Sequence, residues 1–128
     1  MQGKQVEWFE DKKTVKIRLP IKGTSIKKIE VEVSDLVLKV NVTEKNMVRV
    51  FDLKHEVEWQ SKEQQSIYQN EVLEIQLIKK SEEIWGELTE AKLSKEELKV
   101  RRADSLKRKE EVVAAQLKEY ESLKYSMC

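Results

Sequence analysis

The sequence predicts a mainly β protein, a seven-stranded antiparallel β-sandwich followed by one long C-terminal α-helix. Three observations lead to this fold class. Short segments in which apolar and polar residues alternate recur through the first part of the chain, and this is the period of strands with one buried face. Turn residues separate these segments at intervals of roughly 8–12 residues, as in β-sandwiches. Beyond Thr89 the alternation gives way to an unbroken run of helix-forming residues.

Seven strands are expected between the N-terminus and Lys79. They span residues 6–9, 15–21, 29–33, 36–42, 48–50 with a continuation towards 53 and 57, 65–69, and 72–79. Pro20 lacks the N–H group that a sheet ladder requires, so the second strand is expected to lie at an edge or to leave the sheet there. Asn70 and Glu71 are expected to form the hairpin turn between the last two strands. Because parallel crossovers need roughly a dozen residues and none is available, the strands are expected to pair antiparallel.

Large apolar side chains along these strands are expected to fill the core. In the last strand they alternate with Glu74 and Gln76, so that one side of the strand is buried. A tryptophan beyond the following acidic turn is expected to fold back over the end of the sheet and close the core. The predicted core residues are Trp8, Leu38, Leu53, Leu73, Ile75, Leu77 and Trp85.

The C-terminal helix is expected to begin directly after Ser94. Ser94 and Glu97 have the spacing of a capping box, in which each side chain accepts a hydrogen bond from the other residue's backbone N–H. No Gly or Pro follows before about Tyr125, and a helix of this length would measure roughly 46 Å. Glu110 and Lys124 interrupt its apolar stripe, so packing against a partner helix and a fully solvated helix both stay open.

Two parts are therefore expected, a β-sandwich over residues 1–90 and a charged helix over residues 91–128 that starts a linker to further domains. The residue types expected of an enzyme are missing from both. His55 is the only histidine and Cys128 the only cysteine, so neither a catalytic triad nor a metal site is predicted. The three glycines stand in no nucleotide-binding motif. We predict no catalysis and no cofactor.

Charge and hydropathy narrow the classes of partner. Charged residues make up 38% of the chain, but their formal net charge is only +1. Basic groups at 101–102 and 107–109 leave nuclear shuttling open, yet acidic residues interrupt them and no aromatic platform accompanies them, so nucleic-acid binding is not predicted. No apolar run approaches the roughly 18–20 residues of a membrane span, and the N-terminus has no signal-peptide pattern. A cytoplasmic protein with protein partners is expected.

Exposed side chains of the sandwich are the candidate contacts for such partners. Lys16, Arg18 and Lys22 alternate with the apolar residues of the second strand and are expected to form a docking face. Trp59 lies in a polar loop, where it serves either as a core anchor or as an exposed binding residue.

Several segments together resemble the CS domain, the CS/HSP20-like sandwich shared by the small acidic co-chaperone of the ninety-kilodalton heat-shock protein, the NudC proteins and the SGT-type adaptors. The resemblance covers about residues 4–90. The segments are Trp8, Val15–Leu19, Leu36–Val40, Asp52–Val57 and the run from Leu73 through Trp85 to Leu88. The resemblance implies a non-catalytic module that binds other proteins. The aromatic-rich extension of the acidic co-chaperone is absent, and the capped helix stands in its place.

Within that family, four features resemble the CS–TPR class of assembly factors for axonemal dyneins. They are Leu19–Gly23, Leu38–Val42, Ile78–Lys80 with Trp85, and the charged helix. This likeness implies a cytosolic scaffold that brings dynein subunits or their assembly factors to heat-shock chaperones, with tetratricopeptide repeats beyond Cys128. The alternative is a structural component of a large assembly such as the ciliary axoneme, which the long helix would contact.

Overall fold

The computed structural model describes residues 6–126, so the predicted lone cysteine, Cys128, lies outside the described residues. Two compact units divide the chain, one that extends to Lys92 and one that begins at Leu93. The elements of the first unit are β1 (Glu7–Glu10), β2 (Thr14–Pro20), the 3-10 helix η1 (Ile26–Lys28), β3 (Ile29–Val33), β4 (Val37–Val42), the 3-10 helix η2 (Thr43–Lys45), β5 (Met47–Asp52), β6 (Gln65–Gln69) and β7 (Val72–Ile78). The second unit is the helix α1 (Lys95–Ser126).

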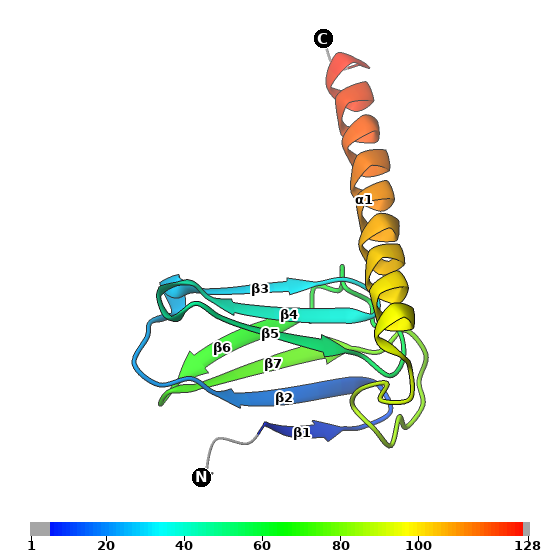
Figure 1. The fold of residues 1–128 in the computed structure, drawn as a ribbon. Helices are drawn as coiled ribbons and strands as arrows, with labels where there is room; N and C mark the ends of the chain where they lie inside the picture. The colour runs from blue at the N-terminus through cyan, green and yellow to red at the C-terminus, as the bar shows by residue number, and fades with distance from the viewer. Residues whose placement is uncertain (1–5, 127–128) are drawn as a thin grey trace. The chain divides into compact units, whose positions relative to one another are not determined.

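Within the described residues, the strands form two antiparallel sheets that face each other (Figure 1). One sheet has four strands in the order β1-β2-β7-β6, and the other has three in the order β3-β4-β5. The predicted seven-stranded antiparallel sandwich followed by a long helix is therefore confirmed. β1, β6, β3 and β5 are the edge strands.

Pro20 does not place β2 at an edge, because β2 lies between β1 and β7. The expectation of an edge strand was therefore wrong, whereas the alternative that the strand leaves the sheet at this residue is confirmed. β1 pairs with β2 only between Val15 and Arg18, and β2 ends at Pro20. The missing N–H group therefore lies beyond the reach of β1, which explains how a proline is tolerated here.

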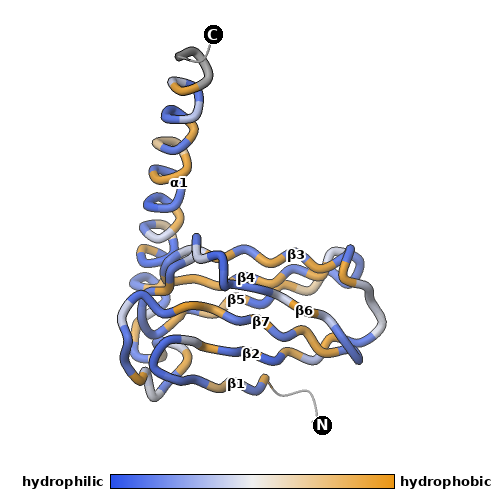
Figure 2. The backbone as a smooth tube through the Cα atoms, turned by 180° about the vertical axis from the view of Figure 1, so that it is seen from behind, coloured by the Kyte–Doolittle hydropathy of each residue, from blue (hydrophilic) through white to orange (hydrophobic). Residues whose placement is uncertain are grey.

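The core fills the space between the two sheets, and the tube in Figure 2 alternates between hydrophobic and hydrophilic residues along the strands. Seven side chains were predicted there. Six of them are buried, namely Leu38, Leu53, Leu73, Ile75, Leu77 and Trp85. The seventh, Trp8, is half-buried and packs against the same cluster. Full burial of one such side chain is worth about 1.5–3 kcal/mol, so this cluster is the main source of the stability of the sandwich.

The fifth strand ends earlier than its sequence pattern indicated. β5 ends at Asp52. Beyond it the chain forms two isolated antiparallel β-bridges, one between Leu53 and Thr89 and one between Val57 and Lys79. Val48 and Val50 point to the outside of their sheet, because the opposite face of β5 carries the buried Phe51.

The hairpin turn and the helix start follow the predicted local chemistry. Asn70 and Glu71 both have positive φ values, 52° and 61°, as the two central residues of a type I′ turn require. The Ser94 N–H donates to Glu97 Oε1 over 3.1 Å, and the Glu97 N–H donates to Ser94 Oγ over 3.2 Å. The predicted turn and capping box are thus present. Among the described residues, no helix combines the length and the apolar character that crossing a membrane requires.

Candidate functional site: the outer face of the four-stranded sheet

Two rows of side chains cross the outer face of the sheet β1-β2-β7-β6, which we call the docking face. Because neighbouring strands are in register, residues on adjacent strands stand side by side about 5 Å apart. The first row runs across the four strands as Glu7, Arg18, Glu74 and Ile67. The second row runs as Phe9, Lys16, Gln76 and Gln65.

Arg18 stands near the centre of the docking face, between two carboxylates. Its Nη1 atom is 3.9 Å from Glu7 Oε1, and its Nε atom is 3.6 Å from Glu74 Oε2. Both distances suit ion pairs but exceed those of N–H···O hydrogen bonds. Arg18 Nε is also inaccessible to solvent and has no hydrogen-bond partner among the described residues. The guanidinium group is therefore held between two carboxylates, with Nε covered, while the side chain as a whole stays 43% exposed.

A small hollow opens beside this arginine. It has a volume of about 160 Å³ and is lined by Arg18, Ile67, Gln69, Asn70, Val72 and Glu74. Ile67 exposes 43% of its surface on one side of the arginine, and Phe9 exposes 54% on the edge strand β1. Arginine and aromatic side chains are among the residues enriched in protein-binding hot spots.

The structure separates the residues that the sequence grouped as one docking face. Lys16 and Arg18 share the outer face of β2, in adjacent rows. Lys22 follows the end of β2 and lies in the turn before η1, so it belongs to an end of the sandwich instead. Trp59 lies in the segment between β5 and β6, is half-buried and packs against the core. Its role as a binding residue stays a prediction.

Sequence reasoning missed Phe9, Ile67, Glu7 and Glu74 as members of the docking face. The alternation within each strand indicates which residues share a face of that strand. Only the pairing register, however, shows that these four side chains and Arg18 stand together.

A second polar cluster lies at the end of the same sheet, around Lys79. Its ammonium group donates to Glu10 Oε1 at 2.6 Å and to the carbonyl oxygens of Asp11 and Glu83 at 2.5 and 2.6 Å. The same ammonium group lies 5.4 Å from the ring centroid of Trp85. Because all three ammonium protons have acceptors, this lysine stabilises the fold and has no donor left for a substrate.

Hydrogen bonds also determine the protonation of Glu10. Partial burial raises the pKa of its carboxyl group. Several interactions outweigh burial and hold the pKa of this carboxyl group below its ordinary value. They are the hydrogen bond from Lys79, the hydrogen bonds from the backbone N–H groups of Trp85 and Gly86, and the positive charge of Lys79. The carboxylate is therefore ionised in the folded protein at neutral pH.

His55 lies beside one carboxylate and one aromatic ring. Its Nδ1 atom is 3.7 Å from Glu83 Oε1, and its ring meets the Trp85 ring edge-on at 5.7 Å between centroids. Within the part of the chain that the structure describes, no three side chains of the metal-binding types gather in one place.

Comparison with known proteins gives the fold a class. No family model matches the sequence, and no curated protein does. A nuclear movement protein from E. cuniculi GB-M1 superposes with a TM-score of 0.57 at 20% identity, over 66% of this chain and 98% of that one. The CS domain of the human KIAA1068 protein gives 0.56 at 20% identity, over 70% and 75%. Heat shock protein 16.0 from Schizosaccharomyces pombe gives 0.53 at 14% identity, over 70% and 94%. The fold is thus a CS/HSP20-like β-sandwich.

Proposed function

We propose that this chain is a non-catalytic protein-interaction module of a co-chaperone or adaptor, and that it binds its partner on the docking face. The arrangement of Arg18 carries this proposal. Its guanidinium group is positioned by two carboxylates without hydrogen bonds to them, and it lines a small hollow together with the exposed Ile67. A neutral acceptor of the partner, such as a backbone carbonyl, can accept a hydrogen bond from the outer guanidinium nitrogens while an apolar side chain packs on Ile67.

The partners belong, in this proposal, to the machinery that assembles axonemal dyneins. The chain resembles the N-terminal part of dynein axonemal assembly factor 4, a CS–TPR protein of ciliated cells. It would bring dynein subunits or assembly factors to heat-shock chaperones in the cytoplasm. The CS/HSP20-like fold, and the presence of a CS domain and a heat shock protein among the structural neighbours, support this class of function.

The test is binding of the 128-residue chain to purified heat-shock chaperones and to purified dynein subunits, measured by pull-down and calorimetry at low salt. Charge pairs at the rim of an interface contribute most under that condition. We expect Arg18→Ala and Lys16→Ala to weaken binding, Arg18→Ala by at least about tenfold if this arginine is a hot spot.

Lys39→Ala provides the matched control, because Lys39 is exposed on the outer face of the other sheet. The Lys39→Ala variant should bind the partner with the same affinity as the unmodified chain. Absence of binding to every chaperone and dynein component, or equal losses with Lys39→Ala and Arg18→Ala, would contradict the proposal.

A structural role in the axoneme is the second candidate, and exposed apolar side chains of α1 favour it. Leu106, Val113, Leu117 and Tyr120 each expose between 46% and 65% of their surface, which suits contact with another helix. Cell fractionation separates the two functions. An assembly adaptor should remain in the soluble fraction, whereas a structural component should sediment with extracted axonemes and be released by substitutions in α1.

A further inference from the structure

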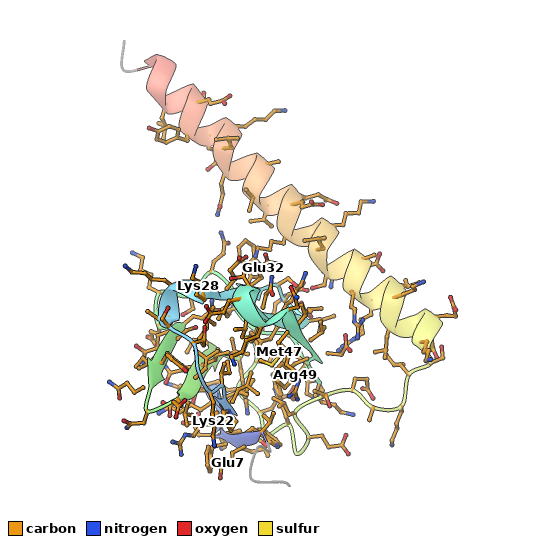
Figure 3. All side chains as sticks on the ribbon, turned by 60° about the vertical axis from the view of Figure 1, so that its left-hand side comes forward. Glu7, Lys22, Lys28, Glu32, Met47 and Arg49 are labelled. Atoms are coloured by element: carbon orange, nitrogen blue, oxygen red, sulfur yellow. The ribbon has the colours of Figure 1, made fainter. Side chains whose placement is uncertain are left out.

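Of the three basic residues predicted to form the docking face, Lys22 alone does not lie on it. It belongs to an end of the sandwich built from residues 21–28, 43–46 and the turn 70–71, which we call the basic end. Figure 3 brings this side of the molecule forward, with Lys22 and Lys28 labelled. The strands β2, β4 and β6 finish here, and β3, β5 and β7 begin here.

Hydrogen bonds join the three segments of the basic end into one surface. Thr24 Oγ1 donates to Glu44 Oε1 at 2.6 Å, which links the turn after β2 to η2. The Gly23 N–H donates to Glu71 Oε2 at 3.0 Å, which links the same turn to the β6–β7 hairpin. The side chains that these segments carry are therefore presented together.

Positive charge is in excess on this surface. Its four lysines are Lys22, Lys27, Lys28 and Lys45. None of them forms an ion pair within the described part of the chain, and all four are exposed. The Nζ atom of Lys45 would lie 3.2 Å from a Cβ atom added to Gly23, so its ammonium group extends over the neighbouring turn.

The two carboxylates of the basic end accept hydrogen bonds from Thr24 and Gly23, and no lysine of the described residues lies within ion-pair distance of them. Ile26 lies among these charges, between the turn and the lysines of η1, and exposes 51% of its surface. The basic end thus combines unpaired cations with one exposed apolar side chain.

We propose that the basic end is a second interaction surface and that it binds an acidic, extended segment of a partner protein. Carboxylates of that segment would approach the four lysines, and one of its apolar side chains would pack on Ile26. Complementary charge raises the association rate and selects partners, even where each exposed pair adds little affinity.

The chemistry of the surface favours a peptide over the other polyanions. Among its described residues there is no arginine and no aromatic side chain, the groups that usually stack on or grip nucleic-acid bases and phosphates. Glu44 and Glu71 would repel a continuous row of phosphates. A single isoleucine offers far less apolar surface than the helical faces that insert into membranes.

The experiment titrates the isotope-labelled 128-residue chain with a synthetic peptide of alternating Glu and Leu, followed by NMR and by fluorescence anisotropy. We expect the shifted amide signals to cluster in residues 22–28 and 43–46. Lys27→Gln with Lys28→Gln should weaken binding about fivefold to tenfold, as the loss of two exposed pairs allows. Lys12→Gln with Lys62→Gln removes the same charge at the other end of the sandwich and should leave the affinity unchanged.

Ile26→Ser separates the apolar contact from the charges. It should weaken binding of the Glu–Leu peptide severalfold and leave binding of a Glu–Ser peptide of equal charge unaltered. A thermal unfolding curve for each variant shows that the sandwich is retained.

Four outcomes would overturn the proposal. The first is an equal loss of peptide affinity in the two lysine double variants, and the second is an equal affinity for a Gln–Leu peptide and the Glu–Leu peptide. The third is tighter binding of a charge-matched oligonucleotide or anionic vesicle. The fourth is a shift of the amide signals with protein concentration alone, which would show that copies of the chain associate. None of these substitutions lies on the docking face, so such a failure would leave the proposed function in place.

Discussion

The ammonium nitrogen of Lys79 lies 2.6 Å from Oε1 of Glu10, and this ion pair joins the end of β7 to the edge strand β1. The Lys79 side chain has no solvent exposure, and that of Glu10 only 13%. The carboxylate also accepts the backbone N–H groups of Trp85 and Gly86, at 2.8 and 2.9 Å. The pair therefore holds the segment that places Trp85 against the core.

Replacement of Glu10 by Gln should destabilise the sandwich strongly. The substitution leaves the Lys79 charge buried without its counter-ion, which typically costs about 3–5 kcal/mol. Urea unfolding followed by tryptophan fluorescence measures the change. Glu82→Gln is the control, because its ion pair with Lys13 is exposed and should be worth less than about 1 kcal/mol. Equal effects of the two substitutions would contradict the structural role of the buried pair.

The contribution of Glu10 should also depend on pH. Its pKa is lowered in the folded state, so its contribution is present above the unfolded value of 4.5 and is lost as the pH falls through the lower folded value. The difference in unfolding free energy between the unmodified chain and Glu10→Gln should therefore stay constant from neutral pH to about pH 5 and shrink below it. Unfolding curves recorded at a series of pH values test this, and a difference that grows on acidification would contradict it.

The hairpin between β6 and β7 requires a backbone conformation that few residues adopt. Asn70 has a φ of 52°, so Asn70→Ala should cost about 1 kcal/mol through left-handed strain. Asn70→Gly, which tolerates positive φ, should change the stability by only a few tenths. Thermal denaturation of the two variants provides the comparison. A loss in both would show that the Asn side chain matters more than its backbone.

The capping box at Ser94 should determine how well α1 begins. Ser94→Ala removes the acceptor for the Glu97 N–H and should cost about 1 kcal/mol of helix stability. Ser94→Asp keeps an acceptor at the same position and should retain the helix. Far-UV circular dichroism of the whole chain over a temperature series measures both. Identical melting of the helical signal in the two variants would contradict the capping role.

The two isoleucines at the centre of β6 and β7 should behave differently because they lie on opposite faces. Ile75 is fully buried, so Ile75→Ala should cost about 2–5 kcal/mol. Ile67 points to the docking face, so Ile67→Ala should change the stability by less than about 0.5 kcal/mol but weaken partner binding. Unfolding and binding measurements on the two variants test whether Ile75 lies in the core and Ile67 on the docking face. An Ile75→Ala variant as stable as the unmodified chain would contradict this placement.

Much of the fold could be predicted because it depends on local patterns. Alternation in 72–79 identified the buried face of β7, and the serine and glutamate at 94 and 97 identified the helix start. Each of these features is satisfied by neighbours within a few residues. The position of Pro20 was misjudged because it depends on a distant segment. Whether β2 is an edge strand or a central strand is decided by the pairing of β1 alongside it.

The candidate site could be predicted only in part. Lys16 and Arg18 were found because strand alternation places both on one face of β2. The separation of Lys22 from them, and the approach of Glu7, Glu74 and Ile67 to Arg18, follow from the order and register of four strands. Those are set by pairings between residues far apart in the chain, whose relative free energies no local pattern records.

The sequence by itself determined the number of strands, the side of most strands that is buried, the turn at 70–71 and the start of the helix. Only the tertiary structure decided the strand order, the docking face and the basic end. The physical reason is that side-chain periodicity and capping act over a few residues. A surface, in contrast, is assembled from segments that the burial of a shared core brings together.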